Sequence, residues 1–216
     1  MPTTLTDALQ FSLISLTSIF FLVDPFAAIP AFFAMTADSD QQRRKRMAAR
    51  AAWTCFIVLT AFALAGSLIF KLFGITLPAF KIAGGIILVL IGLEMLQARR
   101  SQTKETPPET EEGAEKEDAG IIPLGIPMLA GPGSISTVMV LMGQSERWWQ
   151  VVPIFVAIGI TALASYWVLA GADRVRGYLG ETGIRILMRM MGLLLVAIAV
   201  QFILNGLADL GVVKKP

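Results

Sequence analysis

The sequence predicts an all-α membrane protein with six transmembrane helices, arranged as two inverted three-helix repeats with broken first and fourth helices. Three observations lead to this fold class. Of the 216 residues, 55% are hydrophobic and 16% are charged, whereas soluble domains carry about 25% charged residues. Four uncharged runs have 19 or more residues, enough to cross a hydrocarbon core of about 30 Å. A proline-containing interruption, Asp24-Pro25, has a counterpart at Gly131-Pro132.

Composition also limits the chemistry available to the chain. The sequence has one cysteine, Cys55, and no histidine. An intrachain disulfide, a multi-cysteine zinc site and a Ser-His-Asp triad are therefore excluded. We expect no enzymatic activity, no cofactor and no metal site. Residues 1–10 lack Lys and Arg, so the basic region of a cleaved signal peptide is missing and the first span is expected to stay.

The six expected spans follow from the uncharged runs. The first covers 8–37 and is interrupted by Asp24, and the third covers about 75–97 with Lys81 and Glu94 near its ends. The second, fourth, fifth and sixth contain the uncharged runs 51–70, 121–144, 148–172 and 190–208.

Between the third and fourth spans lies an acidic stretch, 98–120, which contains Pro107 and Pro108 and almost no apolar residue. Such a stretch cannot bury a core, so we expect a disordered cytoplasmic linker. It separates the first three-helix repeat, 1–97, from the second, 121–216.

An internal duplication supports this division. At an offset of 107, four residues near the breaks and four in the third span meet identical residues, and Glu94 meets Gln201. The pairs are Ile19/Ile126, Leu22/Leu129, Pro25/Pro132, Met35/Met142, Gly85/Gly192, Leu88/Leu195, Val89/Val196 and Ile91/Ile198. Because each half has an odd number of spans, the second half enters the membrane in the opposite sense. The alternative is two similar apolar halves without common ancestry.

The two interruptions predict broken helices. Proline fits the first turn of a helix and disrupts its interior, so Asp24 is expected to cap a half-helix that begins at Pro25. Pro30 would lie in the interior of a half-helix that begins at Pro25, where proline is disruptive. The alternative prediction is therefore an irregular stretch from Val23 to Ile29. Residues 131–133 form the second break. Irregular backbone at membrane depth requires protein or water around it, so both breaks are expected to face the interior.

The breaks predict a binding site for a zwitterion. A half-helix N-terminus attracts a carboxylate, and glycines let a ligand approach the backbone. Asp24 is the candidate for holding an ammonium group or a coupling proton. The predicted substrate-binding residues at the breaks are Asp24, Pro25, Gly131, Pro132, Gly133, Ser134 and Thr137, with Ser134 and Thr137 on one helix face. The alternative is that Asp24 only caps a helix and the glycines only allow close packing.

Three further polar residues lie in the last spans of the two halves. Gln201 and Asn205 share a face at i, i+4 spacing, and we predict that both contribute to the substrate site. Glu94 is either a second coupling carboxylate or an interfacial residue whose side chain reaches water. Small residues in the third and fifth spans permit tight packing within the bundle, and a homodimer interface is the alternative.

The basic residues predict the orientation. If both termini lie outside and the linker is cytoplasmic, 13 of the 18 Lys and Arg residues lie on the cytoplasmic side. The positive-inside rule favours this orientation. The cluster at 43–46 is interpreted as topogenic, with anionic lipid or nucleic acid as alternative ligands. We expect the lipid bilayer and a small-molecule substrate as partners, and no nucleic acid.

Four motifs resemble the MarC family of bacterial and archaeal membrane proteins. They are Asp24-Pro25-Phe26-Ala27-Ala28-Ile29-Pro30, the start of the third span at 81–85, the Pro127 to Gly133 block, and 191–192 with 201–206. The resemblance implies a six-span inner-membrane protein, kinship with LysE-type exporters and, for some members, transport of small neutral amino acids such as glycine and alanine.

The function we expect is that of a multi-pass inner-membrane secondary transporter. It would carry small neutral amino acids or similar small metabolites by alternating access, coupled to protons. A membrane enzyme or envelope assembly factor without transport activity, and a passive channel, are the alternatives.

Overall fold

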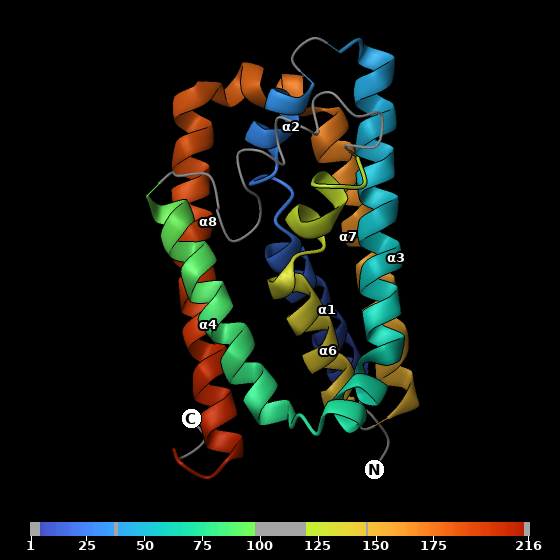
Figure 1. Cartoon of the computed structure of the whole chain (residues 1–216), viewed down its shortest axis with the longest axis vertical. Coiled ribbons are helices and arrows are strands. Elements are labelled where there is room, and N and C mark those ends of the chain that lie inside the picture. The colour runs from blue at the N-terminus through green and yellow to red at the C-terminus, as the bar shows by residue number, and fades with distance from the viewer. Residues whose placement is uncertain (1–4, 37–38, 98–119, 146, 214–216) are drawn as a thin grey trace.

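The computed structural model describes residues 5–36, 39–97, 120–145 and 147–213, and every regular element within these ranges is a helix. Apart from Gly120, the predicted linker lies outside the described residues. The elements in chain order are α1 Leu5–Val23, α2 Ile29–Met35, α3 Gln41–Phe73, α4 Leu77–Leu96, η1 Leu124–Leu129, α6 Pro132–Gln144, α7 Trp148–Ala170 and α8 Ala172–Asp209 (Figure 1).

The described helices suit a membrane. Four contain stretches long and apolar enough to span one, namely Gln41–Gly66, Leu77–Leu96, Trp148–Ala170 and Thr182–Asp209, and a shorter apolar helix covers Asp7–Val23. The first and fourth predicted spans are interrupted, between α1 and α2 and between η1 and α6. Both interruptions lie where the sequence predicts them. The all-helical membrane fold class is therefore confirmed.

Two helices, α3 and α8, extend beyond the predicted uncharged runs. α3 begins early because the Asp40 Oδ1 accepts the backbone N–H of Arg43 at 2.7 Å, and it ends at Gly74, whose φ is 64°. α8 contains a bend at Gly180, with φ 63°. The part before this bend lies across one end of the bundle, and the rest runs along it (Figure 1).

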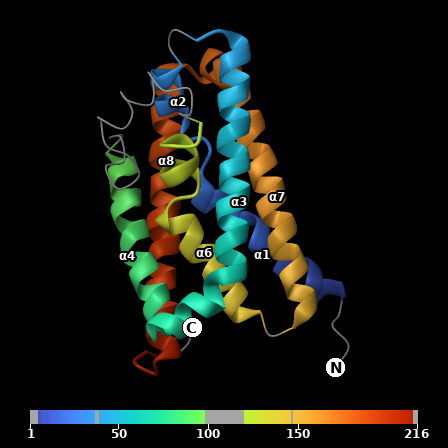
Figure 2. The ribbon, with the colours of Figure 1, turned by 45° about the vertical axis from the view of Figure 1, so that its right-hand side comes forward.

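The two halves of the chain run in opposite senses. α1 and α2 lead away from the end of the bundle that carries the N-terminus, α3 returns and α4 leads away again (Figures 1 and 2). η1 and α6 then run toward that end, α7 leads away and α8 returns. The start of α1 and the end of α8 therefore lie toward one end of the bundle, and the end of α4 lies toward the other (Figure 1).

α4 and α8 pack against each other through glycines. A Cβ atom on Gly85 would lie 2.8 Å from the carbonyl oxygen of Ala199, and one on Gly92 would lie 2.6 Å from the Val196 side chain. Only residues without a side chain permit backbones to approach this closely. α1, α3, α6 and α7 surround the main core, which includes Phe32 of α2.

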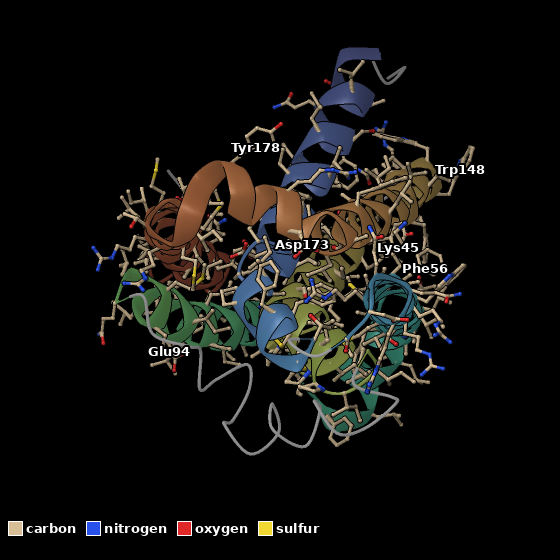
Figure 3. All side chains as sticks on the ribbon, turned by 90° about the horizontal axis from the view of Figure 1, so that it is seen from above. Lys45, Phe56, Glu94, Trp148, Asp173 and Tyr178 are labelled. Carbon is tan, nitrogen blue, oxygen red and sulfur yellow. The ribbon has the colours of Figure 1, made fainter. Side chains whose placement is uncertain are left out.

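Ion pairs connect helices at both ends of the bundle. At the end that carries α2, Arg44 Nη1 contacts both carboxylate oxygens of Asp173, at 2.9 and 3.0 Å. The same guanidinium donates to the carbonyl oxygen of Thr36 at the end of α2. At the opposite end, Lys81 Nζ lies 2.6 Å from Asp209 Oδ2. Figure 3 shows Asp173 where the start of α8 passes over α2.

Candidate functional site

The first break is centred on Asp24. Among the described residues it is the one non-glycine with a positive φ, 47°. Its side chain is 5% exposed, and its Oδ1 accepts the backbone N–H of Ala27 at 3.3 Å. Its carbonyl oxygen accepts the same N–H at 3.2 Å. Aspartate tolerates the left-handed region because its short side chain forms such local hydrogen bonds.

This geometry corrects the predicted start of the half-helix. Asp24 closes a turn and is not the N-cap, because α2 begins at Ile29 and its N-cap is Ala28. Pro25 therefore does not occupy the first helical turn. Pro30 does, and in the first turn the missing N–H of proline costs no hydrogen bond within the helix. The irregular stretch covers residues 24–28. It lies within the stretch from Val23 to Ile29 that Pro30 predicts from the sequence.

The second break has the predicted cap. Gly131 is the N-cap of α6 and Pro132 its first residue. A Cβ atom on Gly131 would lie 2.5 Å from the carbonyl oxygen of Pro127, so the turn requires glycine. The hydroxyl of Ser134 lies within donating distance of the carbonyl oxygens of Leu129, at 2.9 Å, and Gly131, at 3.0 Å. That hydroxyl ties α6 to η1.

Gly133 brings the two breaks together. Its Cβ direction meets Leu88 of α4 at 2.4 Å and Leu22 of α1 at 3.5 Å. The start of α6 therefore lies against the end of α1, two residues before Asp24. The Cβ direction of Gly133 is filled by two leucines, so this close packing requires a residue without a side chain.

Buried hydroxyls line the surrounding helices. Thr137 is 1% exposed, and Ser15 of α1 and Thr161 of α7 are fully buried. In these three residues the hydroxyl oxygen has no hydrogen-bond partner. Other helical hydroxyls in this chain, including those of Ser12 and Thr36, donate to the carbonyl four residues earlier. Buried polar groups are nearly always bonded, so these hydroxyls are candidates for contact with a polar ligand.

Gln201 and Asn205 share a face, as predicted, because Gln201 Nε2 donates to Asn205 Oδ1 at 2.9 Å. Gln201 is exposed and Asn205 is partly exposed. Glu94 lies elsewhere. A Cβ on Gly192 would meet Met95 at 2.8 Å, so Glu94 is level with Gly192, nine residues or about 13 Å from Gln201 along α8. Figure 3 shows Glu94 on the outer side of α4.

Thus the structure places the end of α1, just before Asp24, against the start of α6, while Glu94 lies on α4 and Gln201 and Asn205 lie on α8. Sequence reasoning did not select Ser15 and Thr161. Single hydroxyls are common in apolar helices, so only their missing partners distinguish them. Within the described residues, no three Cys, Asp or Glu side chains gather as a metal site would require.

An apolar helical bundle with two interrupted helices and buried polar groups defines an integral membrane protein. The model of the family described as "MarC family integral membrane protein" matches residues 9–210, and the chain belongs to that family. A UPF0056 membrane protein of Methanocaldococcus jannaschii is 41% identical over 203 residues, covering 92% of this chain and 97% of its own. YhcE, a UPF0056 membrane protein of Escherichia coli, is 34% identical, with 88% of each chain covered. No solved structure matches significantly.

Proposed function

We propose that the chain is an inner-membrane secondary transporter with six spans in two inverted repeats. It carries a small neutral amino acid or similar small metabolite by alternating access, coupled to protons. The observation that carries the proposal is the approach of the start of α6 to the end of α1, where a Cβ on Gly133 would lie 3.5 Å from Leu22, because it sets two backbone interruptions near each other in an apolar bundle. Broken helices at corresponding positions of two repeats are typical of transporter binding sites.

The contacts between α4 and α8 support the inverted repeat. At the offset of 107, Gly85 corresponds to Gly192 and Gly92 corresponds to Ala199. Gly85 packs against Ala199, and Gly92 packs against Gly192. Each residue therefore meets the counterpart of the other, which is the pattern that a two-fold axis between α4 and α8 requires. The opposite chain directions of the halves agree with such an axis.

The chemistry at the breaks supports a zwitterionic substrate. The N–H groups of Gly133 and Ser134 lie in the first turn of α6, where they have no carbonyl partner within the helix, and the helix dipole favours a carboxylate there. Asp24 supplies the opposite charge for an ammonium group, or accepts the coupling proton. Thr137 adds a buried hydroxyl. Leu22 and Leu88 fill the space in the Cβ direction of Gly133.

Alternating access requires two bodies that move around a fixed site. The α4 and α8 pair is one candidate body, because its glycine contacts hold the two helices together. It meets the other helices through Leu88 against Gly133 and Gly84 against Ser136. We propose that these contacts slide or separate as the site changes its exposure.

The proposed orientation, with both termini outside and the linker cytoplasmic, rests on the distribution of Lys and Arg. Cys55 is replaced first, and single cysteines are then placed in the linker and near the C-terminus. A thiol reagent that does not cross the membrane is then added to intact cells. It is expected to label the C-terminal cysteine and not the linker cysteine. The reverse labelling pattern contradicts the orientation.

Transport by purified protein in vesicles tests the function. A pH gradient is expected to drive saturable uptake of labelled glycine or alanine, and unlabelled amino acid inside the vesicles is expected to accelerate exchange. Protein-free vesicles are the control. Uptake that rises linearly with concentration and shows no counterflow indicates a passive channel. Absence of movement across a panel of small metabolites contradicts the transporter proposal.

A further inference from the structure

The outer face of the bundle carries an apolar groove between α3 and α7. Its floor consists of small residues, among them Ala52, Gly159 and Ala162, and its walls are aromatic side chains, among them Trp53 and Tyr166. Its volume is about 380 Å³. Trp53 is 63% exposed, so the groove opens on the surface that faces the membrane. Seen along the bundle, α3 lies at the edge of the molecule beside α7 (Figure 3).

A second hollow of about 360 Å³ adjoins the first at Trp53 and Ala49, which line both. Its lining includes Arg46 and Arg50, one helical turn apart on α3. Both arginines are exposed. The basic hollow therefore adjoins the apolar groove, with Ala49 and Trp53 in both linings.

The dimensions of this groove match one membrane leaflet. Ten residues separate Arg46 from Phe56 along α3, a rise of about 15 Å, which is half of the hydrocarbon thickness of about 30 Å. Arg46 consequently lies near the headgroup layer when Phe56 lies near the bilayer centre. Arg50 lies about 6 Å deeper, and its long side chain can extend to the same layer.

We propose that this groove binds one anionic phospholipid. The phosphate lies between Arg46 and Arg50, and one acyl chain lies over Gly159 and Ala162. A guanidinium group binds phosphate through two parallel hydrogen bonds. The groove also gives the acyl chain a larger contact area than two helices without a groove between them. Zwitterionic lipids carry a cationic amine that the arginine pair repels, so the site prefers a headgroup with net negative charge.

Fluorescence of Trp53 tests the proposal. In a variant with Trp148, Trp149 and Trp167 changed to Phe, Trp53 is the remaining tryptophan. The variant is placed in phosphatidylcholine vesicles containing a small fraction of brominated phosphatidylglycerol or brominated phosphatidylcholine. Quenching is expected at a much lower fraction of the phosphatidylglycerol probe. Native mass spectrometry of the unmodified protein, with the same two lipids, gives the preference independently of the tryptophan changes.

The headgroup contact has a matched control. Arg46→Gln and Arg50→Gln are each expected to lower the preference for phosphatidylglycerol about fivefold. Lys45→Gln removes the same charge from the same helix turn, but Lys45 does not line the groove, and a change of less than about twofold is expected. Equal effects of Lys45→Gln and Arg46→Gln indicate general surface attraction and overturn the proposal.

The proposed contact of the acyl chain with Gly159 and Ala162 is tested by filling the groove. A Cβ on Gly159 would meet only Phe56, at 3.9 Å, so Gly159→Leu projects into the groove without a clash at its base. Quenching of Trp53 by the brominated chains is expected to lose its preference for phosphatidylglycerol. Val156→Leu, on an exposed part of α7 outside the groove, is expected to leave it unchanged. Unchanged preference in Gly159→Leu, or equal quenching by both probes in the starting protein, overturns the proposal.

Discussion

A Cβ atom on Gly92 of α4 would lie 3.0 Å from the carbonyl oxygen of Gly192 of α8, and one on Gly192 would lie 2.9 Å from the carbonyl oxygen of Gly92. The contact is reciprocal, so the two backbones touch at a point where neither helix has room for a side chain. Helices in a membrane associate through such close packing because lipid provides no hydrophobic drive between them.

Gly92→Ala is therefore expected to destabilise the protein. The added methyl would lie 2.6 Å from Val196 Cγ2, and overpacking of this kind costs about 1–3 kcal/mol. Gly177→Ala is the control, since a Cβ there meets nothing within 4 Å and alanine favours a helix by about 1 kcal/mol. Thermal unfolding in detergent measures both. A loss in Gly177→Ala as large as that in Gly92→Ala contradicts the packing argument.

Ser134 and Thr137 are expected to respond differently to loss of their hydroxyls. Ser134→Ala removes a hydrogen bond to the backbone of the break and should reduce stability by about 0.5–1.5 kcal/mol. Thr137→Val replaces a buried hydroxyl without a partner by a methyl group of similar shape, so stability should stay equal or rise. Substrate affinity should fall in Thr137→Val.

Thermal unfolding and substrate binding, measured on the same preparations, separate these two residues. A Thr137→Val protein that is less stable than the starting protein indicates that the hydroxyl has a structural partner. Unchanged substrate affinity in that variant removes Thr137 from the proposed site.

The ion pair of Lys81 and Asp209 connects the start of α4 to the end of α8. The Lys81 side chain is 5% exposed and that of Asp209 is 26% exposed. Asp209→Asn leaves a buried ammonium group without its counterion, which we expect to cost about 1–3 kcal/mol, less than for a fully buried pair. Lys81→Met in the same background should recover part of the loss, and unfolding in detergent measures it. No recovery in the double variant indicates that Asp209 acts through other contacts.

The positions of the breaks were predictable because proline and glycine act locally. Pro132 fits the first turn of a helix, and the structure begins α6 there. Asp24 was harder to place, because Pro25 and Pro30 both suit a first turn and only packing decides between them. Phe32 of α2 is 2% exposed, which ties the short helix that starts at Ile29 to the core.

Contacts between distant helices were less accessible to sequence reasoning. Glu94 and Gln201 occupy equivalent positions in the two halves. In an antiparallel pair, however, equivalent residues lie at different heights unless they are near the axis. Leu88 and Leu195 are near it, because Gly85 faces Ala199 and Gly92 faces Gly192, while Glu94 and Gln201 are not. The Ser134 hydroxyl likewise depends on the path of η1, which residue spacing does not specify.

Asp24→Asn separates the functional role of Asp24 from its structural role. Asparagine also tolerates the positive φ of 47°, and its side-chain oxygen still accepts the N–H of Ala27, so the turn and the stability should be retained. The negative charge is lost. If Asp24 holds the substrate ammonium group, affinity should fall by about 1.5–3 kcal/mol, the range for a hydrogen bond to a charged group. Asp24→Leu, which removes both the charge and the side-chain hydrogen bond to Ala27, should in addition lower the unfolding temperature. Isothermal binding and vesicle uptake measure the first effect, and unfolding in detergent measures the second. Normal binding and uptake in Asp24→Asn would assign Asp24 to the turn alone and would move the search for the coupling group to other residues.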